Sequence, residues 1–334
     1  MTSTKAVKTV TPSVSVVVAT RNRAEMLERL LDALAAQRGA GLFEVVAVDD
    51  GSTDDTWDRL TRRAEVETAF TLVPLRQEVN AGPATARNRG WRAASAPVVC
   101  FTDDDCIPRP GWREAHLARV TCGADIVQGQ TLPVPEQRDR WNPLCRSYTR
   151  TRDGGFYETC NMAYRREVLE AVDGFDETFR FPYGEDTDLA WRAIDKGYAV
   201  QFCREAEVHH EVWTFEWPAY FADLRRREGM VQLVQKHPNL RGLFPAPWYE
   251  HRRHTAALQT TACLLAVAAR PKSPVRWAAA GGAIANYWSV SKIARPGPRR
   301  VRHWAGYLPL TLASDLAEVG VMAVYSAKHR TFLL

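Results

Sequence analysis

The stretch VVCFTDDD, residues 98–105, decides the fold because an apolar run ends abruptly in three carboxylates. A short apolar run rich in β-branched residues is typical of a strand buried in a parallel sheet. Two carboxylates separated by one residue leave the end of a strand on the same side, and hard divalent cations prefer such oxygen ligands. A solvated acidic turn accounts for the same residues equally well, so the rest of the chain has to decide.

Strand and helix signals alternate on the N-terminal side of this stretch. Apolar runs at 14–19, 43–48 and 70–75 predict strands. A helical pattern follows each run, and the third pattern begins at Pro83. This order predicts an α/β fold with a mostly parallel sheet and helices on both faces. Ligands bind such sheets beyond the carboxyl ends of the strands. Polar clusters follow three of the predicted strands at that end: Thr20-Arg21-Asn22, Asp49-Asp50 and Asp103-Asp104-Asp105.

The pattern changes after residue 213. Between 124 and 213 we predict strands at 126–131, 157–163 and 206–210, a helix after Arg165 and a helix at 186–196. An amphipathic helix is expected at 217–236, followed by apolar stretches at 255–269, 277–294 and 305–327. We therefore predict a catalytic domain at 13–213 and a basic, helical C-terminal region at 214–334.

The C-terminal region is strongly basic. Residues 214–334 hold 17 Lys and Arg against 6 Asp and Glu, which suits an anionic surface such as a phospholipid face, although a simply solvated surface explains the charge equally well. The third apolar stretch contains Asp315 and Glu318, and charges near the centre of a membrane span are costly. We expect helices that pack or lie at the membrane interface rather than clean spans.

Cysteine usage and the N-terminus favour the cytoplasm. The seven cysteines form no C-x-x-C pair, which argues against a disulfide framework and a structural zinc site. The first residues contain no apolar run typical of a signal peptide. We expect a protein that stays in the cytoplasm, either in the cytosol or at the cytosolic face of the cell membrane.

Three further motifs carry residues suited to chemistry, each with an ordinary alternative. Asp186 stands where a helix begins and suits either an N-cap or a general base. The pair His209-His210 ends a predicted strand, so only one ring can face a metal site. The segment from Asn80 to Arg87 combines a helix N-terminus with a cation, which suits a diphosphate or simply an exposed loop and helix.

Taken in order, these motifs resemble family 2 glycosyltransferases of the inverting GT-A fold, with an α-helical appendage here. The resemblance covers about residues 13–213. It rests on Thr20-Arg21-Asn22, Val48-Asp49-Asp50-Gly51-Ser52-Thr53-Asp54, Asn80-x-Gly82, Ala86-Arg87-Asn88-x-Gly90, Asp103-Asp104-Asp105, Gly174-Phe175-Asp176-Glu177 and Gly184-Glu185-Asp186-x-Asp188-Leu189-x-x-Arg192.

The resemblance implies a role for each candidate residue. It implies an inverting transfer of a sugar from a nucleotide-diphosphate donor to an acceptor hydroxyl, with Mn²⁺ or Mg²⁺ held by Asp105 and His210. Asp186 corresponds to the catalytic base. The resemblance also places residues at the nucleotide-sugar donor. These are Thr20 and Arg21 near the nucleobase, Asp50 in contact with the nucleobase, Asp103 near the ribose, Asn161 in the sugar pocket, and Asn22, Asn80, Gly82, Arg87, Asp104 and Glu185.

Other functions fit the sequence less well. A non-catalytic nucleotide-sugar-binding protein would not need Asp186, and a dinucleotide oxidoreductase would carry G-x-G-x-x-G after the first strand. No nucleic-acid-binding module is recognisable, so no nucleic-acid partner is expected. Processive polysaccharide synthases carry Q-x-x-R-W after the Glu-Asp motif, whereas here Gln137 to Trp141 comes before it. We therefore expect a single sugar addition, in the synthesis of a glycan, a glycolipid or a glycosylated metabolite.

Overall fold

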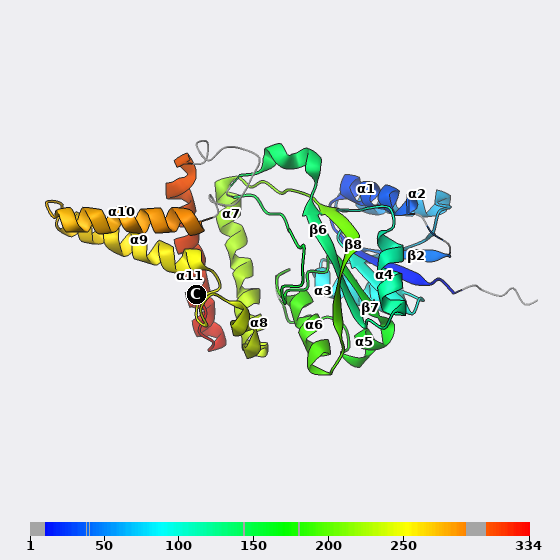
Figure 1. Cartoon of the computed structure of the whole chain (residues 1–334). Coiled ribbons are helices and arrows are strands. Elements are labelled where there is room, and N and C mark those ends of the chain that lie inside the picture. Colours follow the sequence, from blue (N-terminus) through cyan, green and yellow to red (C-terminus); the bar gives the residue numbers. More distant parts are fainter. Residues whose placement is uncertain (1–10, 38, 40, 143, 180, 292–304) are drawn as a thin grey trace, which may run out of the picture. The chain divides into compact units, whose positions relative to one another are not determined.

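The chain folds into two compact units. A computed structural model describes residues 11–334 except 38, 40, 143, 180 and 292–304 (Figure 1). The first unit comprises Met1–Leu132, Thr149–Glu177 and Leu189–His210, and the second comprises Pro133–Tyr148, Thr178–Asp188 and Glu211–Leu334. The longest segment of the second unit thus begins close to the predicted boundary after residue 213, which itself stays a prediction.

The first unit is built on an eight-stranded sheet with the order β3-β2-β1-β4-β7-β6-β8-β5. The first four of these strands are mutually parallel, whereas β7 is antiparallel to β4 and β6, and β5 is antiparallel to β8. The bounds are β1 Val14–Thr20, β2 Phe43–Asp50, β3 Thr71–Gln77, β4 Val98–Thr102, β5 Cys106–Pro108, β6 Ile126–Pro133, β7 Asn161–Arg165 and β8 Val200–His210. The predicted α/β class is confirmed.

Helices cover both faces of this sheet (Figure 1). Val16 and Val18 of β1 face a core with α1 (Ala24–Ala35), α2 (Thr56–Val66) and α4 (Trp112–Thr121), whereas Val17 faces the opposite core. The opposite core includes α3 (Pro83–Ala93), α5 (Arg166–Ala171) and part of α6 (Glu185–Asp195). The alternation of side chains along a strand explains why one apolar run serves two helical layers.

Three predicted elements differ from the structure. The strand predicted at 206–210 is the end of β8, which begins at Val200. The predicted strand at 157–163 begins only at Asn161, because the backbone N–H of Asn161 closes a turn by donating to the carbonyl of Glu158. The helix predicted at 217–236 is three pieces: α7 Trp217–Asp223, a 3₁₀ turn Leu224–Arg227 and α8 Glu228–Lys236. The other 3₁₀ segments described are Pro135–Arg140, Pro238–Leu243 and Ala305–Tyr307.

The three predicted apolar stretches are helices of the second unit: α9 Arg252–Ala269, α10 Pro274–Val290 and α11 Leu308–His329. Residues 292–294 of the second stretch lie outside the described residues. Helices α9 and α10 form a hairpin whose base packs on α11 through Tyr287 and Leu312. By length and composition, α11 is the one described helix able to cross a membrane, and 33% of its most apolar window is buried within the protein.

The acidic residues of α11 belong to a buried ion-pair network. Arg253 of α9 contacts Asp315 at 2.8 Å and Glu318 at 2.6 Å. Glu318 also pairs with Arg227, and Asp315 accepts a hydrogen bond of 2.7 Å from the Tyr287 hydroxyl. Buried charges persist when they are paired and hydrogen-bonded, so these carboxylates fix α11 against α9 and the 3₁₀ turn.

Candidate active site

The three aspartates after β4 have different main partners. Asp103 pairs with Arg87 of α3 at 2.8 Å. Asp104 is buried and accepts hydrogen bonds from the Thr20 hydroxyl at 2.8 Å and from Arg23 at 2.6 Å. Burial raises the pKa of Asp104 to about 6, although the nearby guanidinium opposes that rise. Asp104 therefore ties the end of β1 to the end of β4.

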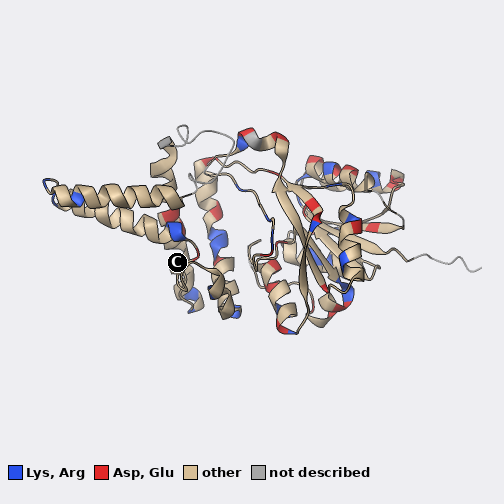
Figure 2. Cartoon of the chain, in the orientation of Figure 1, with Lys and Arg blue, Asp and Glu red and all other residues tan. Residues whose placement is uncertain are grey.

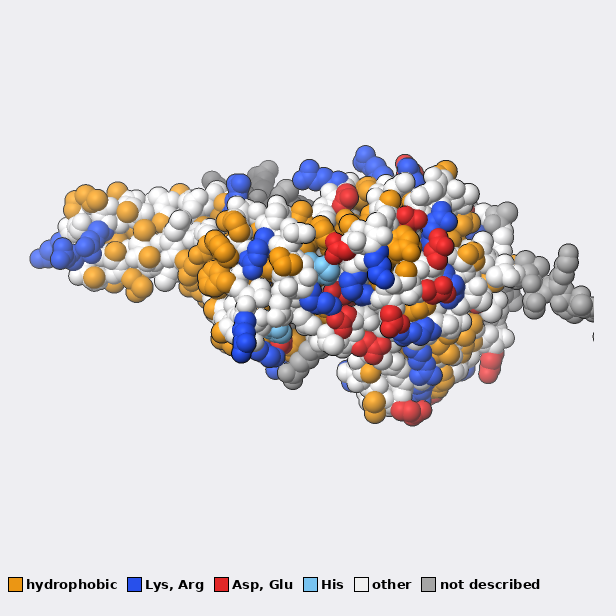
Figure 3. All heavy atoms as spheres, turned by 90° about the horizontal axis from the view of Figure 1, so that it is seen from below, with side chains coloured by type: hydrophobic (Ala, Val, Ile, Leu, Met, Phe, Trp, Pro, Cys, Tyr) orange, Lys and Arg blue, Asp and Glu red, His pale blue; other side chains and the backbone are white. Residues whose placement is uncertain are grey.

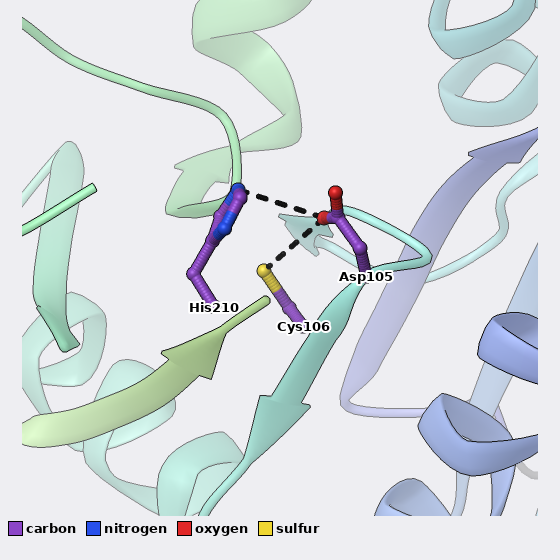
Figure 4. A group of neighbouring side chains, drawn as sticks. All are labelled: Asp105, Cys106 and His210. Atoms are coloured by element: carbon purple, nitrogen blue, oxygen red, sulfur yellow. Dashed lines mark hydrogen bonds and ion pairs between the residues drawn. The ribbon is translucent and has the colours of Figure 1, made fainter. Parts of the chain in front are cut away.

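Asp105 and His210 are brought together by the pairing of β5 with β8. Cys106, the first residue of β5, lies directly opposite His210, the last residue of β8. This register places the His210 Nε2 atom 3.6 Å from Oδ1 of Asp105, with both side chains buried (Figure 4). His209 faces Glu207 instead, at 3.0 Å. His210, and not His209, thus lies beside Asp105, and its role as a metal ligand stays a prediction.

These atoms fit a divalent cation. One ligand atom from each of Asp105, Cys106 and His210 lies within 4.8 Å of the other two. A carboxylate oxygen and an imidazole nitrogen are ligands that Mn²⁺ and Zn²⁺ accept. The second oxygen of Asp105 faces Arg23 at 3.4 Å, which orients the carboxylate so that Oδ1 points to His210. The sequence analysis did not identify Arg23, because no local pattern around it predicts a contact with Asp105, more than eighty residues away in the chain.

Asp50 lies at the end of β2 in a nest of donors. Its carboxylate accepts hydrogen bonds from the Gln77 side chain at 2.6 Å, the Ala81 backbone N–H at 2.8 Å and the Gly82 backbone N–H at 2.9 Å. Gly82 has φ of 92°, a conformation that favours glycine, and immediately precedes α3. The amides of residues 81 and 82 therefore bond Asp50, while Asn80 is exposed.

The residues after β1 form the neighbouring loop. Thr20 is buried and its hydroxyl is used by Asp104, whereas Arg21 and Asn22 are exposed. Asn22 has φ of 52°, and its side-chain oxygen accepts a hydrogen bond of 2.8 Å from the Thr53 backbone. The loops that follow β1 and β2 are thus joined, as the strand-end argument predicted.

Asn161 has a structural set of contacts. Its Oδ1 atom accepts hydrogen bonds from Trp112 at 2.7 Å and from His116 at 2.9 Å, and its Nδ2 atom donates to the carbonyls of Gln130 and Ala206. An asparagine side chain has two acceptor and two donor positions, so all four are used within the protein. Asn161 is buried, and the sugar contact implied for this residue stays a prediction.

Glu185 and Asp186 open helix α6 and belong to the second unit. Glu185 is buried, and Asp186 is half-buried with Oδ1 accepting from the Thr187 backbone N–H at 2.7 Å. The preceding Gly184 has φ of 98°, and a Cβ atom there would lie 3.0 Å from the Gly229 carbonyl. Helix α8 therefore supports the segment that carries Asp186.

Asp188, which follows the Glu-Asp pair, is held from α8 as well. Its carboxylate contacts Lys236 at 2.7 Å and His237 at 3.0 Å. The role of Asp186 stays a prediction, and the structure adds that its helical turn is anchored through a buried carboxylate.

Comparison with known proteins gives a consistent family. Residues 15–173 match the model of glycosyl transferase family 2. Glycosyltransferase AglE of Haloferax volcanii is 29% identical over 214 residues, which span 61% of this chain and 68% of that protein. Validoxylamine A glucosyltransferase of Streptomyces hygroscopicus subsp. jinggangensis is 29% identical over 269 residues, spanning 69% of this chain and 62% of the relative.

A solved structure extends the likeness along most of the chain. The mannosyltransferase PcManGT from Pyrobaculum calidifontis, in complex with GDP-Man and Mn²⁺, aligns with a TM-score of 0.64 and 25% identity over 93% of this chain and 86% of that protein. The GT-A fold predicted from the sequence is thereby confirmed.

Proposed function

Because residues 15–173 belong to glycosyl transferase family 2, we propose that the protein transfers a sugar, with inversion, from a nucleotide-diphosphate donor to an acceptor hydroxyl. The convergence of Asp105 and His210 at the carboxyl end of the sheet carries the proposal, because a buried carboxylate–imidazole pair there suits a cation that binds a nucleotide diphosphate. The complex of PcManGT with GDP-Man and Mn²⁺ supports a nucleotide sugar and a divalent cation.

The residues divide the work between the donor and the acceptor. Asp105 and His210 would hold a divalent cation, which would neutralise charge on the departing nucleotide diphosphate. Asp50, Asp103 and the loop after β1 orient the nucleotide. Asp186 removes the proton from the acceptor hydroxyl as it attacks the anomeric carbon, and a single displacement inverts that carbon.

A single addition suits the arrangement of the Q-x-x-R-W letters. Gln137 donates a hydrogen bond of 2.5 Å to Glu211, and Arg140 pairs with the same carboxylate at 2.8 Å. These two side chains therefore hold the segment that follows β8. This structural role supports a transferase that adds a single sugar rather than a processive synthase.

The donor is tested by thermal unfolding of the full chain with a panel of nucleotide sugars in the presence of Mn²⁺ or Mg²⁺. A ligand present at 100 times its Kd raises the free energy of unfolding by about 2.7 kcal/mol. We expect one nucleotide sugar to raise Tm clearly more than the others, and to do so only with the cation. Stabilisation by no nucleotide sugar, or equally by NAD, would contradict the proposal.

We also propose that the second unit lies against an anionic membrane surface at the cytosolic face. No Asp or Glu occurs between His251 and Ser314, and the α9–α10 hairpin has Arg270 and Lys272 at its tip (Figure 2). Leu265, Val275 and Trp277 are exposed at 66%, 75% and 56%. Figure 3 shows orange side chains along this hairpin and blue ones at its end. Apolar side chains beside cations are typical of helices that enter a lipid interface.

Vesicle sedimentation tests this surface. The full chain should sediment with phosphatidylglycerol vesicles and much less with phosphatidylcholine vesicles. Trp277→Ser should weaken binding, whereas Trp248→Ser, which also removes an exposed tryptophan (51%), should not. Equal binding to both lipids, or equal effects of both substitutions, would contradict the assignment.

A further inference from the structure

We infer that Cys106 is a third protein ligand of the cation site, which makes the site a carboxylate–imidazole–thiolate trap for thiophilic cations such as Zn²⁺, Cd²⁺ and Co²⁺. The inference deepens the proposed function, because it concerns the cation site of the same transferase. It rests on the placement of one sulfur between the two residues already assigned to the cation.

The strand pairing aims the cysteine at the site. Cys106 and His210 are direct partners in the antiparallel pairing of β5 with β8. Side chains of such partners leave the sheet on the same face, with Cβ atoms about 4.5–5.5 Å apart. Asp105 precedes Cys106 at the turn into β5, and its Oδ1 atom comes back over the same face (Figure 4).

The distances are close to those of a tetrahedral site. Ligands at the usual Zn–O and Zn–N lengths lie about 3.4 Å apart around a tetrahedral ion, and a sulfur lies about 3.6 Å from such an oxygen. Here the Asp105 Oδ1 atom lies 3.6 Å from His210 Nε2 and 4.0 Å from Cys106 Sγ. The first distance exceeds the tetrahedral value by about 0.2 Å and the second by about 0.4 Å, and Sγ of Cys106 lies within 4.8 Å of Nε2 of His210.

The cluster is buried, and its thiolate makes it selective for thiophilic cations. Cys106 is 1% exposed, Asp105 is 7% exposed and His210 is 2% exposed. Soft thiolates select Zn²⁺ and related ions, whereas Mg²⁺ takes oxygen ligands and keeps several waters. A four-coordinate ion with three protein ligands has one position left, which is too few to clamp two phosphate oxygens. Thiophilic ions therefore compete with Mn²⁺ and inhibit transfer.

Absorption spectroscopy of the full chain tests the ligand. The metal-free protein is titrated with Cd²⁺ and, separately, with Co²⁺, and the sulfur-to-metal charge-transfer band in the near ultraviolet is recorded. We expect the band in the wild type and in Cys100→Ala, a matched control that removes another fully buried thiol. We expect its loss in Cys106→Ser and in His210→Ala, with circular dichroism confirming that each variant is folded.

The dissociation constant of Cd²⁺ divided by that of Mn²⁺ provides a second measure. This ratio should rise in Cys106→Ser, because loss of the thiolate weakens Cd²⁺ binding more than Mn²⁺ binding. X-ray absorption of the Zn²⁺-loaded wild type needs no variant and should show one sulfur at about 2.3 Å.

The inference is overturned if the band survives in Cys106→Ser, or if Zn²⁺ binds with only nitrogen and oxygen neighbours. Either result would leave the transferase proposal standing, since Mn²⁺-dependent transfer does not require sulfur. A complete lack of Mn²⁺-dependent donor binding would instead refute the proposed function.

Discussion

His116 should make the stability of the first unit fall in mild acid. The ring is fully buried on α4, and its Nε2 atom lies 2.9 Å from Oδ1 of Asn161. Burial lowers the pKa of His116 to about 4, from an ordinary value of 6.5. Because the folded protein holds the neutral ring, the stability it contributes is complete above pH 6.5 and is lost as the pH falls from 6.5 towards 4.

The size of the effect follows from these two values. The imidazole binds a proton near pH 6.5 in the unfolded chain but only near pH 4 in the folded chain. The free energy of unfolding is therefore lower by about 2 kcal/mol at pH 5 than at pH 7.5. For a unit of this size, that loss lowers Tm by about 4–8 °C.

The variant His116→Gln isolates this titration. A glutamine amide can still donate to Asn161 but does not titrate, so the variant should be less stable at pH 7.5 and should lose about 2 kcal/mol less than the wild type between pH 7.5 and pH 5. Urea unfolding followed by tryptophan fluorescence at both pH values gives the comparison. If the wild type and the variant lost the same free energy of unfolding on acidification, the reasoning about His116 would be wrong.

Three further predictions concern the second unit. Glu318→Gln should lower the free energy of unfolding by about 3–5 kcal/mol, because Arg227 and Arg253 lose a shared buried carboxylate; a loss no larger than that of the exposed Glu216→Gln in urea unfolding would refute this. Gly229→Ala should destabilise by about 1–3 kcal/mol, because the new Cβ atom would meet the Tyr183 carbonyl, whereas Gly320→Ala, whose Cβ atom meets nothing within 4 Å, should stabilise α11; equal Tm shifts would contradict this. Asp186→Asn should leave the donor-induced Tm shift intact and lower turnover by about 10²–10⁴-fold; near-normal turnover in a donor-consumption assay would remove Asp186 from the role of base.

The sheet and its strand-end clusters could be predicted because hydrophobic periodicity is local. The runs at 14–19, 43–48 and 98–102 are buried strands, and the loops that follow them meet as parallel strands require. The contacts within those clusters could not be predicted. Arg23 on Asp105, and Cys106 opposite His210, depend on the register of a three-residue strand with no periodic signal of its own.

The contacts of individual buried side chains could not be predicted from the sequence either. Asn161 stands where the family resemblance implied a sugar contact, yet its amide is saturated by core partners. The charges of α11 suggested a poor membrane span, but their partner Arg253 lies on another helix. Such pairings are formed by tertiary packing and leave no local signal in the sequence.

The central claim is that Asp105 and His210 hold one cation in common, and calorimetric titration of Mn²⁺ tests it most directly. The proteins compared are the wild type, Asp105→Asn, His210→Ala, the double variant and His209→Ala as a control, all in the presence of the stabilising nucleotide sugar. We predict that each single substitution at the site weakens Mn²⁺ binding by at least about tenfold, that the double variant loses far less than the two effects combined, and that His209→Ala binds normally. Wild-type Mn²⁺ affinity in either site variant, or strict additivity in the double variant, would contradict a shared cation.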